Sequence, residues 1–240
     1  MVEIGGFQRV SLMDYPGKIT SIIFLTGCNM RCPFCHNAEL VMRNYNSLRI
    51  YGEDEILEKI SEALNFIEAV TITGGEPTLH QDLEEFLLRC KNLGLSVKLD
   101  TNGLNPEKTK RIIEKNLVDY IAMDVKSALN PARYSASTGL KHQSLTRNIS
   151  ESIKLIINSG IRHEFRTTVV PGLVSPDDLL EIAASIKGAD AYYLQQYNPG
   201  KTLDPKLAEV KPYSRNVLDK ACARISQSGL VTHCEVRATW

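Results

Sequence analysis

Three cysteines lie within eight positions of one short segment, "FLTGCNMRCPFCHN". Cys28, Cys32 and Cys35 have the spacing CxxxCxxC. Thiolates this close in sequence are typical ligands of one metal ion or cluster. A tetrahedral zinc ion would need a fourth ligand, for which His36 and Cys90 are the candidates. In a [4Fe–4S] cluster, each thiolate would instead bind one iron and leave the fourth iron open to a ligand with nitrogen and oxygen donors.

The zinc alternative is weakened by where those fourth ligands lie. Cys35 and His36 are adjacent, and successive side chains point in different directions, so the two seldom reach one tetrahedral ion. Cys90 would have to reach across the fold from a separate amphipathic segment. We expect Cys90, Cys222 and Cys234 to be small buried hydrophobic residues, because free cysteine usually behaves in that way.

Further small and polar residues follow other apolar segments of the chain. "GGEP", residues Gly74–Pro77, follows the second such segment. By itself it also suits an ordinary Gly-Gly turn before a helix, with Pro77 in the first turn. The other polar residues at or near segment ends are Asp100, Asp124, Lys126, Arg166, Thr168, Gln195 and Gln196.

The apolar segments alternate with segments of helical spacing. The predicted strands are Ile19–Leu25, Ala69–Thr73, Ser96–Asp100, Asp119–Val125, Glu164–Val170 and Ala191–Gln195. The predicted helices are Asp54–Asn65, Gln81–Asn92, Pro106–Lys115, Thr146–Ser159 and Pro176–Ile186. This alternation predicts an α/β fold, a partial (β/α)6 barrel with parallel strands, with a doubly wound sheet as the second choice. The polar residues then gather at the carboxyl ends of the strands, where barrels of this kind have their active sites.

Length and composition restrict the class of protein. With 240 residues and 43% hydrophobic residues, we expect a single domain over residues 1–240. Its core would span approximately residues 18–200, and residues 201–240 would add a helix and a strand, or part of a partner surface. Lys plus Arg equals Asp plus Glu, 28 against 28, so we expect neither nucleic acid nor a membrane as a partner. No segment resembles a signal peptide or a membrane span, and a cytoplasmic protein is expected.

The combination of motifs resembles one known family. "CNMRCPFC" and "GGEP" are similar to motifs of the radical S-adenosylmethionine (SAM) superfamily, and "DVK" (Asp124–Lys126) is similar to a third segment of it. "DTNG" (Asp100–Gly103) and "RTTVVPG" (Arg166–Gly172) resemble the glycyl-radical-enzyme activases, such as pyruvate formate-lyase activase. "MDYPGKITSIIFLTGCNMRCPFCHN" is closer still to the activating proteins of anaerobic ribonucleoside-triphosphate reductase.

The resemblance implies a set of cofactor ligands. Cys28, Cys32 and Cys35 would bind a [4Fe–4S] cluster, and SAM would occupy its open iron. The residues expected to contact SAM are Phe34, His36, Gly74, Gly75, Glu76, Asp100, Asp124, Lys126, Arg166, Thr168 and Gln196. No side chain is assigned a catalytic role, because the cofactor carries the chemistry.

Elementary chemistry suits several of these roles. Without a Cβ, the two glycines allow close approach of a ligand, and their carbonyls would accept from the SAM ammonium. Glu76 would add a hydrogen bond to SAM or hold the loop through neighbouring N–H groups. Lys126 would meet the SAM carboxylate and Asp124 its ammonium, with a surface ion pair as the alternative.

The other contacts are assigned less directly. Asp100 would instead bind a cation together with the SAM carboxylate, as in the activases. Phe34 and His36 would frame the adenine, a structural histidine being the alternative. The family's ribose-contacting histidine has no counterpart, so Gln195 or Gln196 is expected there. Arg166 is expected to be functional because a strand interior rarely holds an unpaired arginine.

The resemblance also implies an activity. A glycyl-radical enzyme, the anaerobic ribonucleoside-triphosphate reductase, would be the partner, and a flavodoxin- or ferredoxin-type protein the reductant. One alternative is a radical SAM enzyme for a small molecule, such as a 7-carboxy-7-deazaguanine synthase. The other is a non-catalytic protein whose metal only holds the fold or carries electrons, although a structural site would have no use for "GGEP".

Overall fold

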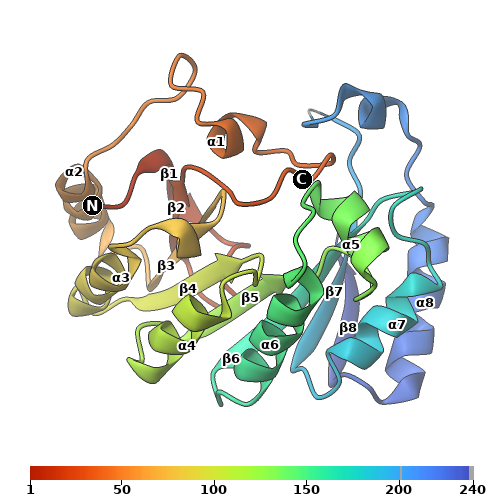
Figure 1. Ribbon diagram of the computed structural model, residues 1–240. Coiled ribbons are helices and arrows are strands. Elements are labelled where there is room, and N and C mark those ends of the chain that lie inside the picture. Colours follow the sequence, from red (N-terminus) through yellow and green to blue (C-terminus); the bar gives the residue numbers. More distant parts are fainter. Residues whose placement is uncertain (201, 238–240) are drawn as a thin grey trace. The chain divides into compact units, whose positions relative to one another are not determined.

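The computed structural model in Figure 1 describes residues 1–200 and 202–237. These residues form two compact units. The first unit comprises Met1–Asn29, Asn37–Thr101 and Glu107–Ile121, and the second comprises Met30–His36, Asn102–Pro106 and the described part of Ala122–Trp240.

The first unit contains four strands in chain order. They are β1 (Ile4–Ser11), β2 (Thr20–Leu25), β3 (Ala69–Gly74) and β4 (Ser96–Thr101). β1 is antiparallel to β2, whereas β2, β3 and β4 are parallel neighbours. β2 and β3 are buried along almost their whole length, as expected of parallel strands that are covered on both faces.

Four helices and one short turn complete the first unit. They are α1 (Ala38–Met42), α2 (Glu53–Ala63), the 3₁₀ turn Pro77–Leu79, α3 (Leu83–Asn92) and α4 (Pro106–Glu114), whose first residue belongs to the second unit. α2 packs beside β1 and α3 beside β4 (Figure 1). Acidic residues begin α3 and basic residues end it, which complements the helix dipole. Fully buried side chains of the core include Ile23, Leu25, Ile56, Ile60, Ile72 and Phe86.

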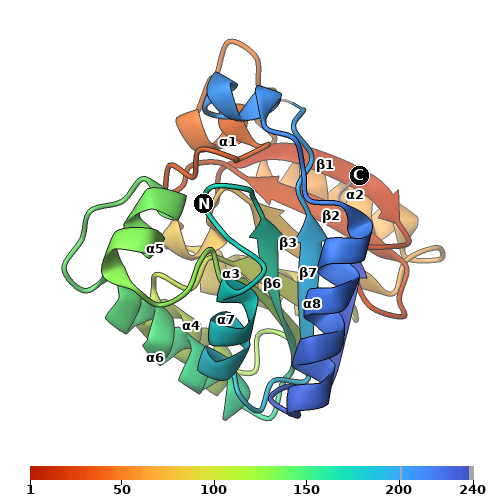
Figure 2. The same ribbon diagram turned by 90° about the vertical axis from the view of Figure 1, so that its right-hand side faces the viewer.

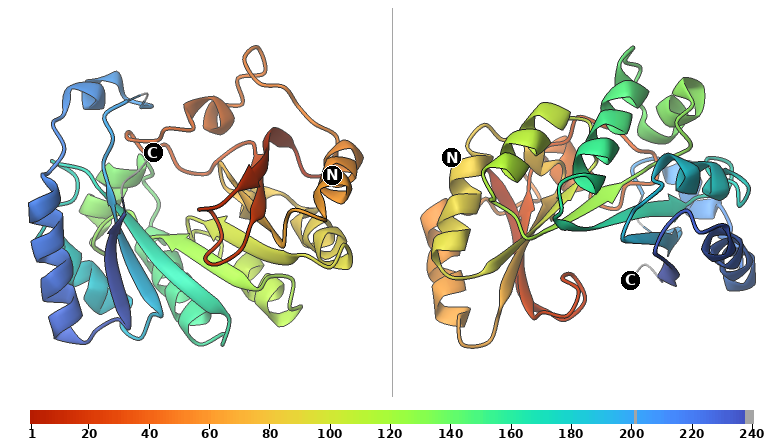
Figure 3. Two further views of the ribbon diagram at one scale, coloured as in Figure 1. Left: turned by 180° about the vertical axis from the view of Figure 1, so that it is seen from behind. Right: turned by 90° about the horizontal axis from the view of Figure 1, so that it is seen from below.

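The second unit follows the same βα pattern. β5 (Tyr120–Asp124) starts in the first unit and ends in the second, and β6 (Arg162–Val169), β7 (Ala191–Gln196) and β8 (His233–Arg237) are parallel neighbours. The helices, labelled in Figure 2, are α5 (Pro131–Thr138), α6 (Leu145–Ile157), α7 (Asp178–Ser185) and α8 (Arg215–Ser228), with a 3₁₀ turn at Pro205–Glu209. α8 packs against α7, β7 and β8, and Figure 3 shows α8 beside β8 in dark blue. Tyr134, Phe165, Tyr192 and Tyr197 are the largest side chains of this core.

The predicted fold class is confirmed: the strands are parallel after β1, alternate with helices and follow the chain in an order that does not close on itself. Each predicted strand and helix lies within two residues of its observed bounds. The helix and strand predicted for residues 201–240 are α8 and β8, residues 201 and 238–240 of that segment lying outside the described residues. That all 240 residues form one domain stays a prediction.

Besides the two short 3₁₀ turns, one strand and two helices among the described residues were not predicted. β1 was missed because "IGGFQRVS" contains two glycines and shows no strict alternation, and it is paired antiparallel at the start of the strand order. α1, with five residues, is too short for a periodic signal. α5 has the sequence "PARYSAST", with few apolar residues, and two of its three buried side chains, Ser137 and Thr138, are polar.

Candidate active site

The cysteines lie on the loop between β2 and α1. Cys28 is half-buried and belongs to the first unit, whereas Cys32, which is buried, and Cys35, which is half-buried, belong to the second. The Cys35 amide donates to the Cys32 carbonyl at 3.0 Å, so one tight turn places these two thiols.

The second unit holds its part of this loop at three points. The Arg31 amide donates to the carbonyl of Thr138, the last residue of α5, at 2.7 Å. The Pro33 carbonyl accepts from the Asp204 amide at 2.8 Å. A ring nitrogen of His36 lies 2.9 Å from the Asn198 carbonyl oxygen. These contacts fix the backbone on both sides of Cys32, and none of them was visible in the sequence.

The end of α5 explains how it reaches this loop. Asn130 caps the helix by accepting from the amides of Ala132 and Arg133, and Gly139 ends it in the left-handed conformation, with φ +64°. A Cβ at Gly139 would lie 2.6 Å from the Arg31 carbonyl oxygen. Glycine is therefore required there both by its φ and by the close approach of the cysteine loop.

The donor set fits a [4Fe–4S] cluster with one open iron. Three thiols within eight positions suffice for three irons. Among residues 1–200 and 202–237, no three His, Cys, Asp or Glu side chains gather as ligands of a single ion.

The two glycines of "GGEP" are packed against the protein's own backbone. A Cβ at Gly74, whose φ is +119°, would lie 2.3 Å from the Leu25 carbonyl oxygen, and one at Gly75 would lie 1.9 Å from that of Gly27. The Gly75 amide donates to the Leu25 carbonyl at 2.8 Å. The missing side chains thus make room for the segment before Cys28; that the glycine carbonyls also meet SAM stays a prediction.

Glu76 is completely buried. Its Oε1 accepts from the Thr78 amide at 3.1 Å, from the Thr78 hydroxyl at 2.6 Å and from the Thr101 hydroxyl at 2.8 Å. A buried carboxylate needs such donors, and these tie the loop after β3 to the end of β4. Of the two roles considered for Glu76, holding the loop is the one that these contacts serve.

Asp100 has a partner that the sequence analysis missed. The Lys98 ammonium lies 2.6 Å from Asp100 Oδ1, and the Lys98 side chain is only 3% exposed. The two residues are two apart on β4 and therefore share a face. In the sequence, a lysine inside a predicted strand, two residues before an aspartate, is the signal that could have revealed this pair.

The second unit brings together Asp124, Lys126 and Arg166. Asp124 Oδ2 accepts from Lys126 Nζ at 2.8 Å and Oδ1 accepts from Arg166 Nε at 2.8 Å. β5 ends at Asp124, so Lys126 lies just beyond the strand rather than on it. The Lys126 ammonium also lies 5.8 Å from the centre of the Phe34 ring.

Electrostatics keep this group ionised. Burial opposes the charge of Asp124, but the Arg166 and Lys126 cations outweigh it and hold the pKa of that carboxyl well below its usual range. Burial likewise opposes the charge of Lys126, but Asp124 and ionised Cys32 and Cys35 raise its pKa. The ammonium therefore lies within electrostatic reach of two of the three cysteine thiols.

A second carboxylate extends this network. Glu164 on β6 is 1% exposed and lies 3.9 Å from Arg166 and 3.2 Å from Arg237 on β8. The Arg237 guanidinium carbon is 3.1 Å from the centre of the Tyr193 ring. β7 lies between β6 and β8, and the residue of β8 at the register of Glu164 is His233 rather than Arg237, so no local pattern in the sequence indicated this contact.

The remaining predicted residues lie near β6 and β7. Thr168 donates its hydroxyl to Gln195 Oε1 at 3.3 Å, and the two are partners in the register of β6 and β7. Gln196 donates to the Tyr213 carbonyl at 2.9 Å. That Phe34, His36, Thr168 and Gln196 contact SAM stays a prediction.

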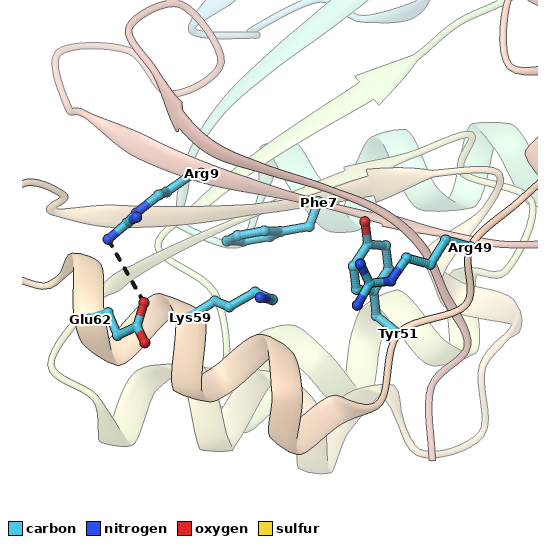
Figure 4. Close-up of a pocket in the computed structure, with 6 residues that line it drawn as sticks. All are labelled: Phe7, Arg9, Arg49, Tyr51, Lys59 and Glu62. Carbon is cyan, nitrogen blue, oxygen red and sulfur yellow. Dashed lines mark ion pairs between the residues drawn. The ribbon is translucent and has the colours of Figure 1, made fainter.

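The first unit has a separate hollow, shown in Figure 4, with a volume of about 280 Å³. Arg9 faces Glu62 at 3.9 Å, while Arg49 and Lys59 face Glu55 at 2.8 and 3.7 Å. Its cations are thus compensated by neighbouring acids. The lining residues are Phe7, Arg9, Arg49, Tyr51, Lys59 and Glu62. In the part of the chain that the structure describes, no helix is long and apolar enough to cross a membrane.

Comparisons with known proteins show the family and the relatives of this chain. The family model described as "Radical SAM superfamily" matches residues 22–196. The chain is 33% identical over 216 residues to a putative glycyl-radical enzyme activating enzyme of Methanocaldococcus jannaschii, over 90% of this chain and 88% of that protein. It is 26% identical over 245 residues to the pyruvate formate-lyase 1-activating enzyme of Escherichia coli K12, over 95% and 96% of the two chains.

Solved structures show the same fold. Streptococcus suis SuiB, bound to its precursor peptide SuiA, matches with a TM-score of 0.69 and 16% identity over 90% of this chain. The match covers 48% of SuiB, so this chain spans about half the length of that protein. QueE from Escherichia coli matches with a TM-score of 0.54 and 16% identity, over 99% and 94% of the two chains.

Proposed function

We propose, from the premise that this chain belongs to the radical SAM superfamily, that it is an activating enzyme that generates a glycyl radical on a partner enzyme. Enzymes of this superfamily use a [4Fe–4S] cluster and SAM, which are accordingly its cofactors. The relatives that match almost the whole chain are named as activating enzymes of glycyl-radical enzymes or of pyruvate formate-lyase.

The observation that carries the proposal is the position of Lys126. Its ammonium lies 5.8 Å from the centre of the ring of Phe34, the residue before Cys35, and is paired with Asp124 at 2.8 Å. A cation and an anion side by side near cluster thiols are the complements of the carboxylate and the ammonium of an amino acid. The methionine end of SAM is such an amino acid, so we assign the Lys126–Asp124 pair to it.

Each part of the site then has a task. When bound, the cluster and SAM would supply the one-electron radical chemistry that the activation of the partner's glycine requires. The thiols of Cys28, Cys32 and Cys35 hold the cluster. Glu76 keeps the "GGEP" loop in place through Thr78 and Thr101.

Charge also has to be balanced around the bound cofactor. An ammonium has three N–H donors, and one of those on Lys126 donates to Asp124. Arg166 donates to the other Asp124 oxygen and so holds the carboxylate in one orientation. Lys126 can thus bind a carboxylate while Asp124 stays fixed.

We further propose the anaerobic ribonucleoside-triphosphate reductase as the partner. The support is the resemblance of "MDYPGKITSIIFLTGCNMRCPFCHN" to the activating proteins of that enzyme. A flavodoxin- or ferredoxin-type protein in the cytoplasm would supply the electron.

The test is electron paramagnetic resonance under strict exclusion of oxygen. The reconstituted protein, SAM and a chemical reductant are mixed with an anaerobic ribonucleoside-triphosphate reductase from the same organism. We expect a glycyl radical signal on the reductase with the unaltered protein and with Cys90→Ala, the matched control, but none with Cys32→Ala.

Other results separate the parts of the proposal. A radical on a different glycyl-radical enzyme, and none on the reductase, would contradict the choice of partner alone. Cleavage of SAM with turnover of a small molecule and no radical on any such enzyme would overturn the activating function. A normal cluster in Cys32→Ala would show that the ligands are wrongly assigned.

A further inference from the structure

Two cysteines outside the cluster motif meet at the end of the chain. Cys222 on α8 donates a hydrogen bond to the Cys234 sulfur on β8, with the two sulfurs 2.8 Å apart. α8 packs directly against β8, and only the short segment after Gly229 connects them. The sequence analysis treated both residues as isolated buried hydrophobic residues.

The surroundings of the two thiols differ. Cys222 is only 8% exposed, whereas Cys234 is partly exposed. Burial raises the pKa of both thiols, and the contact with Cys222 raises that of Cys234 further. At neutral pH both are therefore protonated, so the pair reacts slowly although the sulfurs already touch.

We propose that Cys222 and Cys234 form a modification site, at which a low-molecular-weight disulfide converts them into an intramolecular disulfide bond. The sulfurs would have to approach from 2.8 Å to a bond length of ~2.05 Å. This is a small movement for two side chains on neighbouring elements. The resulting bond would fasten the last helix to the last strand and restrict the unfolding of that segment.

The step balances as a thiol–disulfide exchange. Cys234, the more accessible thiol, loses its proton and attacks one sulfur of the reagent, which releases one reagent thiolate. Cys222 then loses its proton and displaces the second reagent thiolate from Cys234, forming the new S–S bond. The protein gives up two electrons and two protons, and the reagent disulfide becomes two thiols.

Peptide mapping can detect the bond directly. The holoprotein is treated with glutathione disulfide without oxygen, alkylated with iodoacetamide and digested with trypsin without reduction. Cleavage after Lys220, Arg224 and Arg237 places Cys222 and Cys234 in different peptides. We expect these two peptides to appear joined, and joined more rapidly at pH 9 than at pH 7, because more thiolate is present at the higher pH.

Matched variants give the controls. Cys90→Ser, at a fully buried thiol on α3, should leave the joined peptide unchanged. Cys222→Ser should abolish it and leave Cys234 as a mixed disulfide with glutathione. Iron content is measured in each sample to show that the cluster has not been lost.

Either of two peptide-mapping results would overturn the proposal. One is recovery of both residues fully alkylated after prolonged treatment at pH 9. The other is a stable mixed disulfide on Cys234 in the unaltered protein, which would show that Cys222 cannot reach it. A third measurement is independent of the variants: the joined protein should unfold at a higher temperature than the alkylated one, and an equal or lower temperature would contradict the fastening of α8 to β8.

Discussion

Asp124 is the counterion of two largely buried cations in the second unit. It faces two cations, Lys126 and Arg166, and all three side chains are at most one quarter exposed. Removing one partner from a buried charge cluster is more costly than removing a pair, because the remaining charges lose their compensation. Glu164 lies 3.9 Å from the Arg166 guanidinium and cannot replace Asp124 at that distance.

We expect Asp124→Asn to lower the free energy of unfolding by about 3 kcal/mol, because Lys126 and Arg166 lose their counterion, and to raise the KM for SAM about tenfold or more. Urea unfolding and SAM cleavage measured against SAM concentration check the two effects. The control is Asp177→Asn, whose ion pair with Arg224 is exposed and should change stability by less than about 0.5 kcal/mol. An unchanged KM would contradict the role proposed for Asp124.

At the scale of elements, α5 shows how a short helix can position a distant loop. Its N-cap and its C-terminal glycine fix the ends, and its last residues hold Arg31 of the cysteine loop. The Tyr134 hydroxyl on this helix also accepts from the Lys126 amide at 3.2 Å. The helix thus connects the cysteine segment and the residue assigned to SAM.

We expect Gly139→Ala to lower the iron content of the purified protein and to destabilise it by about 3 kcal/mol, since both the left-handed φ and the contact with the Arg31 carbonyl oppose a Cβ. Gly229→Ala is the matched control. Gly229 ends α8 with the same φ of +64°, but nothing lies within 4 Å of its Cβ position. It should cost about 1 kcal/mol and leave the iron content unchanged. Equal iron loss in both variants would exclude a specific role for α5.

α3 and α4 are joined by a cluster of ion pairs around Glu84. Its carboxylate accepts from Lys115 and Arg111 at 2.7 and 2.9 Å, and Lys108 lies 3.3 Å away. Burial opposes the charge, but these three cations lower the pKa of Glu84 from an ordinary 4.5 to about 2. The stabilisation is therefore complete above pH 4.5 and is lost as the pH falls towards 2.

We expect Glu84→Gln to lower the free energy of unfolding by about 1 kcal/mol at pH 7, a value reduced for solvent screening. The difference in unfolding free energy between the variant and the unaltered protein should shrink as the pH falls from 4.5 towards 2. At low pH, protonation makes Glu84 of the unaltered protein neutral, as the glutamine of the variant already is. Glu85→Gln, at the exposed neighbouring position, serves as the control. Urea titrations at several pH values measure this, and a difference that does not vary with pH would contradict it.

At the scale of the whole molecule, the strands and helices that could be predicted are those in which apolar residues recur with a regular period. Alternating apolar strands and amphipathic helices leave a strong local signal, and those elements were placed within two residues. β1 and α5 leave no such signal, because β1 depends on pairing with β2 and most side chains that α5 buries are polar. A local pattern cannot indicate stabilisation that comes from residues far along the chain.

The residues of the candidate site also fall into two groups: those found in short motifs and those brought together only by the fold. The cysteines, "GGEP" and Asp124 with Lys126 could be recognised from short motifs. Lys98 could have been recognised too, because it lies two residues before Asp100 on the same strand. Glu164 and Arg237 could not, because they lie on β6 and β8, which are far apart in the sequence and separated by β7 in the sheet. The pairing of Cys222 with Cys234 was also missed, since it requires that α8 pack against β8.

The close fit of Gly74 and Gly75 against Leu25 and Gly27 has a consequence for how this protein can diverge. Any descendant that gained a side chain at Gly75 would have to move the Gly27 carbonyl, and with it the segment that leads to Cys28. A compensating change at one site alone could not restore the contact, because backbone atoms oppose each new Cβ. Lineages can therefore vary at the exposed helix faces while this junction is inherited as a unit, and a directed-evolution library would gain by leaving both segments out.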